Sequence, residues 1–152
     1  MNYVLLLSFS GVNYHGFQIQ KNKITVQGEL ENALKDIFNE PIKVIGCGRT
    51  DAGVSAIKYY ANFKTDENLN PDKIMGLLNV KLNSDIRVQD CYIKDDAFDA
   101  RHSVKFKTYA YSFYFGNTEI PYYNNFATYV KYNIDINRFK EEMMKFAGTH
   151  DF

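Results

Sequence analysis

Residues 46–54 read Gly-Cys-Gly-Arg-Thr-Asp-Ala-Gly-Val and join two largely apolar segments, residues 42–47 and 56–65. The composition of these segments predicts a strand on each side of a glycine-rich loop. Glycine adopts backbone conformations that are closed to other residues, so the chain can turn sharply here and hold a short polar side chain in a fixed place. The pattern therefore predicts a loop that presents Asp51.

The carboxylate of Asp51 stands where no hydrophobic packing would require one, two residues after Arg49. It is expected to be ionised at neutral pH and could act as a nucleophile or as a general base. Asp51 could instead close its own loop in an Asx-type turn, and the spacing alone leaves both interpretations open. A phosphate-binding loop is disfavoured, because no GK[ST] element follows and a carboxylate repels phosphate.

The segments around this loop alternate between strand and helix. Strands are expected at residues 3–10 and 85–93, and the first is apolar on both faces, as in the interior of a sheet. Thr25 predicts the start of one helix, and the pair Asn70-Pro71 predicts the start of another. Together with the elements below, the order β-α-β-β-α-β-β-α predicts an α+β fold, a ferredoxin-like sandwich with helices on one face of a mostly antiparallel sheet.

The longest strand candidate covers residues 104–115, with alternating side chains. One face would carry Lys105, Lys107, Tyr109 and Tyr111. Lysines and tyrosines on one face suit a surface that follows a nucleic-acid backbone and stacks bases. An edge strand would show the same pattern, because lysines there discourage aggregation while aromatic residues pack. The alternation does not decide between the two.

The C-terminal part of the chain predicts one more helix. Residues 116–133 are too irregular to assign, and Asp135 follows them as a helix cap. Gly148 is expected to end this helix. Its inward face should consist of Phe139, Met143, Phe146 and Ala147.

Length and composition describe a globular chain. Its 152 residues suit one domain or half of a two-lobed protein, and 45% hydrophobic residues with three prolines argue against disorder. Eighteen basic residues balance eighteen acidic ones, which counts modestly against a nucleic-acid partner. The N-terminus shows the pattern of neither a secretory signal nor a spanning helix.

The two cysteines and three histidines indicate no metal site. Cys47 and Cys91 fit no ligand spacing and are too few for a disulfide framework, which favours a reducing cytoplasm. His15, His102 and His150 form no ligand pattern either. We expect these five side chains to serve packing or surface hydrogen bonding.

Six motifs in order along the chain resemble the TruA-type tRNA pseudouridine synthases. The most specific is Gly-Arg-Thr-Asp-Ala-Gly-Val at residues 48–54, which is similar to the signature loop of that family. The other motifs are Tyr-His-Gly-Phe-Gln at 14–18 with Gln20, Thr-Val-Gln-Gly at 25–28, Phe-Asp-Ala-Arg at 98–101, Lys-Thr-Tyr-Ala-Tyr at 107–111 and Gly-Thr-His-Asp-Phe at 148–152. The resemblance covers essentially the whole chain.

This resemblance implies the isomerisation of uridine to pseudouridine in the anticodon arm of tRNA, without a metal or an organic cofactor. Asp51 matches the essential aspartate, which acts on the ribose or the base. Arg49 matches the arginine that helps to extrude the target base, and Tyr109 the tyrosine that packs against the flipped uracil. Further RNA contacts are expected from Tyr14, His15, Phe17, Gln18, Arg101, Lys105 and Lys107.

Two departures from the family pattern limit this comparison. Ser55-Ala56 stands where the family usually has His-Ala. Family members also continue beyond the position of Phe152 into a second lobe, which supplies a basic partner for the aspartate. Residues 1–152 are therefore expected to be the N-terminal lobe of a cytoplasmic homodimer, and to be inactive or nearly so alone. Alternatives are a non-catalytic RNA-binding domain and an interaction domain without a nucleic-acid partner.

Overall fold

The computed structural model describes residues 1–132 and 134–151, and it divides the chain into two compact units, Met1–Lys107 and Thr108–Phe152. Each unit is described by itself. Two of the segments named above include a residue outside those described: the irregular segment 116–133 contains residue 133, and the motif 148–152 contains residue 152.

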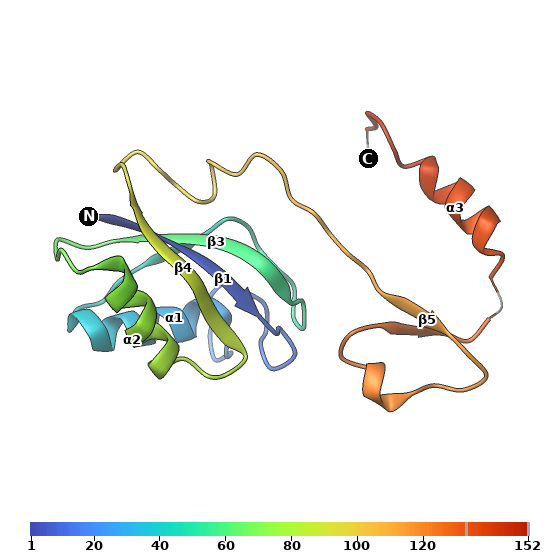
Figure 1. Cartoon of the computed structure of the whole chain (residues 1–152), viewed down its shortest axis with the longest axis horizontal. Coiled ribbons are helices and arrows are strands. Elements are labelled where there is room, and N and C mark those ends of the chain that lie inside the picture. The colour runs from blue at the N-terminus through green and yellow to red at the C-terminus, as the bar shows by residue number, and fades with distance from the viewer. Residues whose placement is uncertain (133, 152) are drawn as a thin grey trace. The chain divides into compact units, whose positions relative to one another are not determined.

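The first unit is a four-stranded antiparallel sheet with two helices. The strands lie in the order β2-β3-β1-β4. Both helices lie on one face of this sheet and contact each other (Figure 1). This is the predicted α+β arrangement, and its strand order is that of a ferredoxin-like sandwich. The elements are β1 (Asn2–Phe9), α1 (Val26–Phe38), β2 (Val44–Gly46), β3 (Ala56–Lys64), α2 (Pro71–Lys81) and β4 (Ile86–Lys94).

Both helices of this unit begin at the predicted caps. The Thr25 hydroxyl accepts a hydrogen bond from the Gly28 N–H at 3.2 Å, and the Asn70 side chain accepts one from the Asp72 N–H at 2.8 Å. These contacts satisfy backbone donors that the first turn of a helix leaves unpaired. Pro71 is the first residue of α2, where its missing N–H costs no hydrogen bond.

The core of the first unit is centred on β1. Tyr3, Leu5 and Leu7 are fully buried against the helices, and Val4 on the other face is fully buried as well. A strand with neighbours on both sides and cover on both faces buries nearly every side chain. The prediction that the first strand lies inside the sheet is therefore confirmed.

The predicted strand 104–115 is wrong over most of its length. Only β5 (Phe113–Phe115) forms there, and it pairs in parallel with β6 (Thr128–Val130) in the second unit. Residues 105–112 are exposed and have no strand partner in the described part of the chain. Alternation marks which side chains would share a face, but a strand exists only where a neighbour pairs its backbone groups.

Tyr114 organises the segment that the sequence left unassigned. Its ring contacts those of Tyr123 and Tyr129 with centroids 5.1 and 5.3 Å apart, and its hydroxyl accepts a hydrogen bond from the Ile120 N–H at 2.9 Å. A short 3₁₀-helix, η1 (Pro121–Tyr123), connects these contacts. Aromatic packing, together with the short β5–β6 pair and η1, therefore orders residues 114–130.

The third helix, α3 (Ile136–Met144), begins as predicted. The Asp135 carboxylate accepts hydrogen bonds from the N–H groups of Asn137 and Arg138 at 2.9 and 3.1 Å. Its expected inward face is exposed, however, which corrects that prediction for Phe139, Met143, Phe146 and Ala147. An apolar repeat marks the face that a helix can bury and does not supply the surface that would cover it.

None of the helices in the described residues is both long enough and apolar enough to span a lipid bilayer.

Candidate active site

Asp51 lies in the loop that joins β2 to β3, and its side chain is exposed. The turn is closed by the backbone, because the Val54 N–H donates to the Asp51 carbonyl at 3.2 Å and Gly53 has φ +82°. Among the described residues, the Asp51 carboxylate has no hydrogen-bond or ion-pair partner. The geometry therefore favours a presented carboxylate over an Asx-type turn.

The segment before α1 braces this loop from the side. The Gly53 N–H donates to the Tyr14 carbonyl at 3.1 Å, and the Gly11 N–H donates to the Ser55 hydroxyl at 3.0 Å. A β-carbon on Gly16, where φ is +83°, would lie 2.2 Å from the Thr50 carbonyl oxygen. The two loops are therefore in backbone contact, and Ser55 takes part in that contact at the position where the sequence departs from the family pattern.

Tyr14 and Phe17, from which RNA contacts were expected, do not lie at the surface. Their side chains are 4% and 2% exposed and belong to the core. The Tyr14 hydroxyl donates to the Asp85 carboxylate at 2.6 Å; burial, followed by this hydrogen bond, raises the pKa of Tyr14 to about 12. A ring enclosed in a core cannot stack on a base, so both residues support the loop. His15 and Gln18 are exposed, as expected.

Tyr59 on β3 holds the start of the same loop. Its hydroxyl donates to the Gly48 carbonyl and accepts a hydrogen bond from the Gly48 N–H at 3.4 Å. The side chain is 5% exposed, and burial raises the pKa of the phenol far above its ordinary value. Sequence reasoning missed this residue. The period-2 pattern of β3 could have found it, because Tyr59 shares the core face with Ala61 and Phe63.

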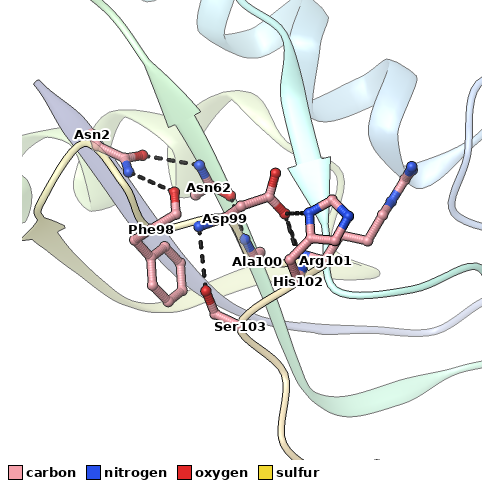
Figure 2. Close-up of polar contacts among 8 residues, drawn as sticks. All are labelled: Asn2, Asn62, Phe98, Asp99, Ala100, Arg101, His102 and Ser103. Carbon is pink, nitrogen blue, oxygen red and sulfur yellow. Dashed lines mark hydrogen bonds and ion pairs between the residues drawn. The ribbon is translucent and has the colours of Figure 1, made fainter.

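Two buried asparagines fasten the segment after β4 to the sheet (Figure 2). The side-chain amide of Asn62 donates to the side-chain oxygen Oδ1 of Asn2 at 2.9 Å, and its own Oδ1 accepts a hydrogen bond from the Ala100 backbone N–H at 2.8 Å. Asn2 donates in turn to the carbonyls of Asp95 and Phe98 at 2.8 and 2.9 Å. Both asparagines are fully buried. Breaking any of these hydrogen bonds would leave a buried polar group unpaired, which costs free energy, so the network holds the segment in one place.

This network positions Arg101, the next residue along the chain. The Asp99 carboxylate accepts hydrogen bonds from the N–H groups of Arg101 and His102 at 2.8 and 3.1 Å. Desolvation is the largest single influence on the pKa of Asp99 and raises it, but these hydrogen bonds and the nearby His102 together outweigh it, so the pKa lies below its ordinary value. In Figure 2 the Arg101 guanidinium points away from these contacts. The positive charge of Arg101 opposes part of the rise in the pKa of Tyr59 that burial causes.

Lys107 lies at the glycine loop that carries Asp51. A β-carbon on Gly48 would come within 2.6 Å of Lys107 Nζ, so the ammonium group sits against the loop backbone. With Arg49 inside the loop, two cations thus lie at the segment that carries Asp51. Lys105 is exposed and has no hydrogen-bond or ion-pair partner among the described residues. Tyr109 belongs to the second unit, so its approach to Asp51 stays a prediction.

Comparison with known proteins identifies the family of this chain. Residues 6–103, well over half of the chain, match the family model described as tRNA pseudouridine synthase. The chain belongs to the TruA-type tRNA pseudouridine synthase family. The matched range contains the glycine loop and Arg101, whereas Lys105, Lys107 and Tyr109 lie beyond it. Within the described residues, no group of three or more His, Cys, Asp or Glu side chains is arranged to hold a metal ion.

Relatives extend the similarity over the whole chain. The "tRNA pseudouridine synthase A" of Aquifex aeolicus is 42% identical over 151 residues, which cover 99% of this chain and 63% of the relative. That of Dictyoglomus thermophilum is 41% identical over 154 residues, 100% of this chain and 63% of the relative. That of Thermoanaerobacter sp. is 37% identical over 151 residues. The chain thus spans less than two thirds of the length of these TruA-type relatives.

Proposed function

We propose that the protein carrying this chain isomerises uridine to pseudouridine in the anticodon arm of tRNA. The observation that carries this proposal is Asp51, an accessible carboxylate without a protein partner among the described residues, held in a braced loop of a TruA-type chain. The reaction breaks the bond between the base and C1′ of the ribose and rejoins the same carbon to C5 of the base. Asp51 acts on the ribose or on the base, as a nucleophile or as the base that removes a sugar proton.

The cations around the loop suit an RNA substrate. Arg49, Arg101 and Lys107 would pair with phosphates beside the target nucleotide, and Arg49 would help to extrude its base. Extrusion costs a few kcal/mol of stacking, whereas a base stacked on an aromatic ring regains about 1–3 kcal/mol. Tyr109 would supply that ring. His15, Gln18 and Lys105 are exposed and would extend the contact surface.

The remaining parts of the proposal concern the whole protein. Residues 1–152 would form the N-terminal lobe, and a further lobe would complete the tRNA cleft and supply the basic partner of Asp51. The protein would act as a cytoplasmic homodimer without a metal or an organic cofactor. A neutral total charge does not oppose RNA binding if the cations near Asp51 face the bound RNA.

The direct test measures release of the C5 hydrogen from tRNA labelled at that position. Asp51→Asn keeps the shape of the side chain and removes its charge, so turnover should fall by about 10²–10⁴-fold while tRNA still binds. Asp66→Asn is the matched control, since Asp66 is exposed and without a hydrogen-bond partner among the described residues. Undiminished release by Asp51→Asn would exclude Asp51 as the catalytic group. Binding without release by the unsubstituted protein would indicate a non-catalytic RNA-binding domain.

A further inference from the structure

The phenol of Tyr59 contacts both polar groups of one loop residue. It accepts from the Gly48 N–H at 3.4 Å and donates to the Gly48 carbonyl, three residues before Asp51. The loop is also held by its own backbone turn, by the segment before α1 and by the Cys47 N–H, which donates to the Tyr60 carbonyl at 2.9 Å. At Gly48, where the backbone has left β2 and enters the loop, the contact to the core is made by the Tyr59 side chain.

The ring of Tyr59 is itself held in one orientation. It stacks on Phe17 with centroids 4.4 Å apart at an interplanar angle of 29°, and it meets Phe9 edge to face at 5.5 Å. Because the phenol is enclosed on two sides, its hydroxyl cannot leave Gly48 without moving core residues. The Phe9 and Phe17 rings thus hold the Tyr59 ring in place, and the Tyr59 hydroxyl in turn holds Gly48 of the loop.

Gly46 leaves the space that the phenol occupies. A β-carbon at this position would lie 2.3 Å from the Tyr59 hydroxyl oxygen and 2.4 Å from a ring carbon of Phe17. Any other residue would displace the phenol or the Phe17 ring. Burial also favours the protonated phenol, which can donate to the Gly48 carbonyl while it accepts from the N–H.

We infer that Tyr59 is a positioning residue, which sets the place of Asp51 for the reaction by clamping Gly48 from the core. The inference rests on the proposed function, because it concerns the reaction that Asp51 performs. Because the Tyr59 side chain is 5% exposed and its hydroxyl contacts the loop at the Gly48 backbone, it acts on Asp51 through that backbone. Misplacement of a catalytic group by about 1 Å costs on the order of 10²-fold in rate.

The test is Tyr59→Phe in the protein that carries this chain, with Tyr60→Phe as the control. Tyr60 is the next residue of the same strand, is 41% exposed, and its hydroxyl has no hydrogen-bond partner among the described residues. For Tyr59→Phe we expect kcat for C5 hydrogen release to fall about 10- to 100-fold and KM for tRNA to stay within about twofold. Tyr60→Phe should match the unsubstituted protein. Gly46→Ala places a β-carbon 2.3 Å from the phenol oxygen and should lower kcat in the same way.

Amide hydrogen exchange provides a readout that needs no activity. In the chain of residues 1–152, Tyr59→Phe should speed exchange of the Gly48 amide and leave that of Cys47, which donates to the Tyr60 carbonyl at 2.9 Å, unchanged. Unchanged kcat per folded molecule in Tyr59→Phe, or unchanged Gly48 exchange, would overturn the inference. No hydrogen release by the unsubstituted protein would instead overturn the proposed function, and the inference would fall with it.

Discussion

Individual residues around Asp51 owe their positions to backbone contacts. Gly16 allows its segment to approach the Thr50 carbonyl more closely than a β-carbon would permit, and Gly46 does the same for the rings of Tyr59 and Phe17. The Tyr59 hydroxyl in turn connects Gly48 to the core. The sequence predicted a presented carboxylate because the motif lacks packing residues. It could not separate this from a turn-forming aspartate, since the difference depends on whether the backbone or the side chain closes the turn.

Lys107 provides a prediction at the residue scale. Lys107→Ala removes a cation that lies against the loop, so tRNA affinity should fall and the slope of log K against log salt concentration should decrease in magnitude by about 1. Filter binding over a range of salt concentrations measures both quantities. Lys73→Ala on α2 is the control, because Lys73 is exposed and on the helix layer of the unit. An unchanged slope would show that Lys107 does not meet a phosphate.

Tyr14 provides a prediction on pH. Its pKa is raised from 10.0 to about 12, so the folded state binds the phenolic proton more tightly than the unfolded state does. The resulting stability is fully present below about pH 10 and is lost as the pH rises through about 12. Urea unfolding between pH 9 and 12 should therefore depend less steeply on pH in Tyr14→Phe. An equal pH dependence in both proteins would contradict a raised pKa for this phenol in the folded state.

At the scale of elements, the caps and apolar periods predicted where most elements lie. All three helices begin at the predicted cap residues, because a cap depends on local sequence. These caps are Thr25, Asn70 and Asp135. The strand predicted at 104–115 is mostly absent, because its existence depends on a partner that local sequence does not reveal. The burial of Tyr14 and Phe17 escaped prediction for a similar reason, since a loop with polar neighbours can still turn its rings into a core.

The asparagine network provides a prediction for an element. Asn62→Ala removes the acceptor of the Ala100 N–H and the donor to Asn2, and leaves the Ala100 N–H and the Asn2 side-chain oxygen buried without these hydrogen bonds. Each such group costs about 1–3 kcal/mol, so the free energy of unfolding should fall by at least about that amount. Denaturant unfolding measures it. Asn68→Ala, at an exposed position without a hydrogen-bond partner among the described residues, should be nearly neutral. Equal stability of the two variants would contradict the role of the network.

At the scale of the whole molecule, residues 1–152 hold the candidate catalytic carboxylate of Asp51, the loop that presents it, and the cations Arg49 and Lys107 at that loop. TruA-type relatives are longer, and this chain spans about 63% of the relative from Aquifex aeolicus. We therefore expect residues 1–152 alone to show little or no turnover, because the basic partner of Asp51 and part of the tRNA cleft would come from the remaining length. Turnover by residues 1–152 equal to that of the longer protein would contradict this expectation.

Nucleoside analysis of tRNA after incubation with the protein that carries this chain tests the central claim most directly. Unmodified tRNA is incubated with the protein or with Asp51→Asn, digested to nucleosides and separated by chromatography. The proposed function predicts that pseudouridine appears at the expense of uridine with the unsubstituted protein and at least about 100-fold more slowly with Asp51→Asn. Equal rates of pseudouridine formation by the two proteins, or none by either when tRNA binding is intact, would contradict it.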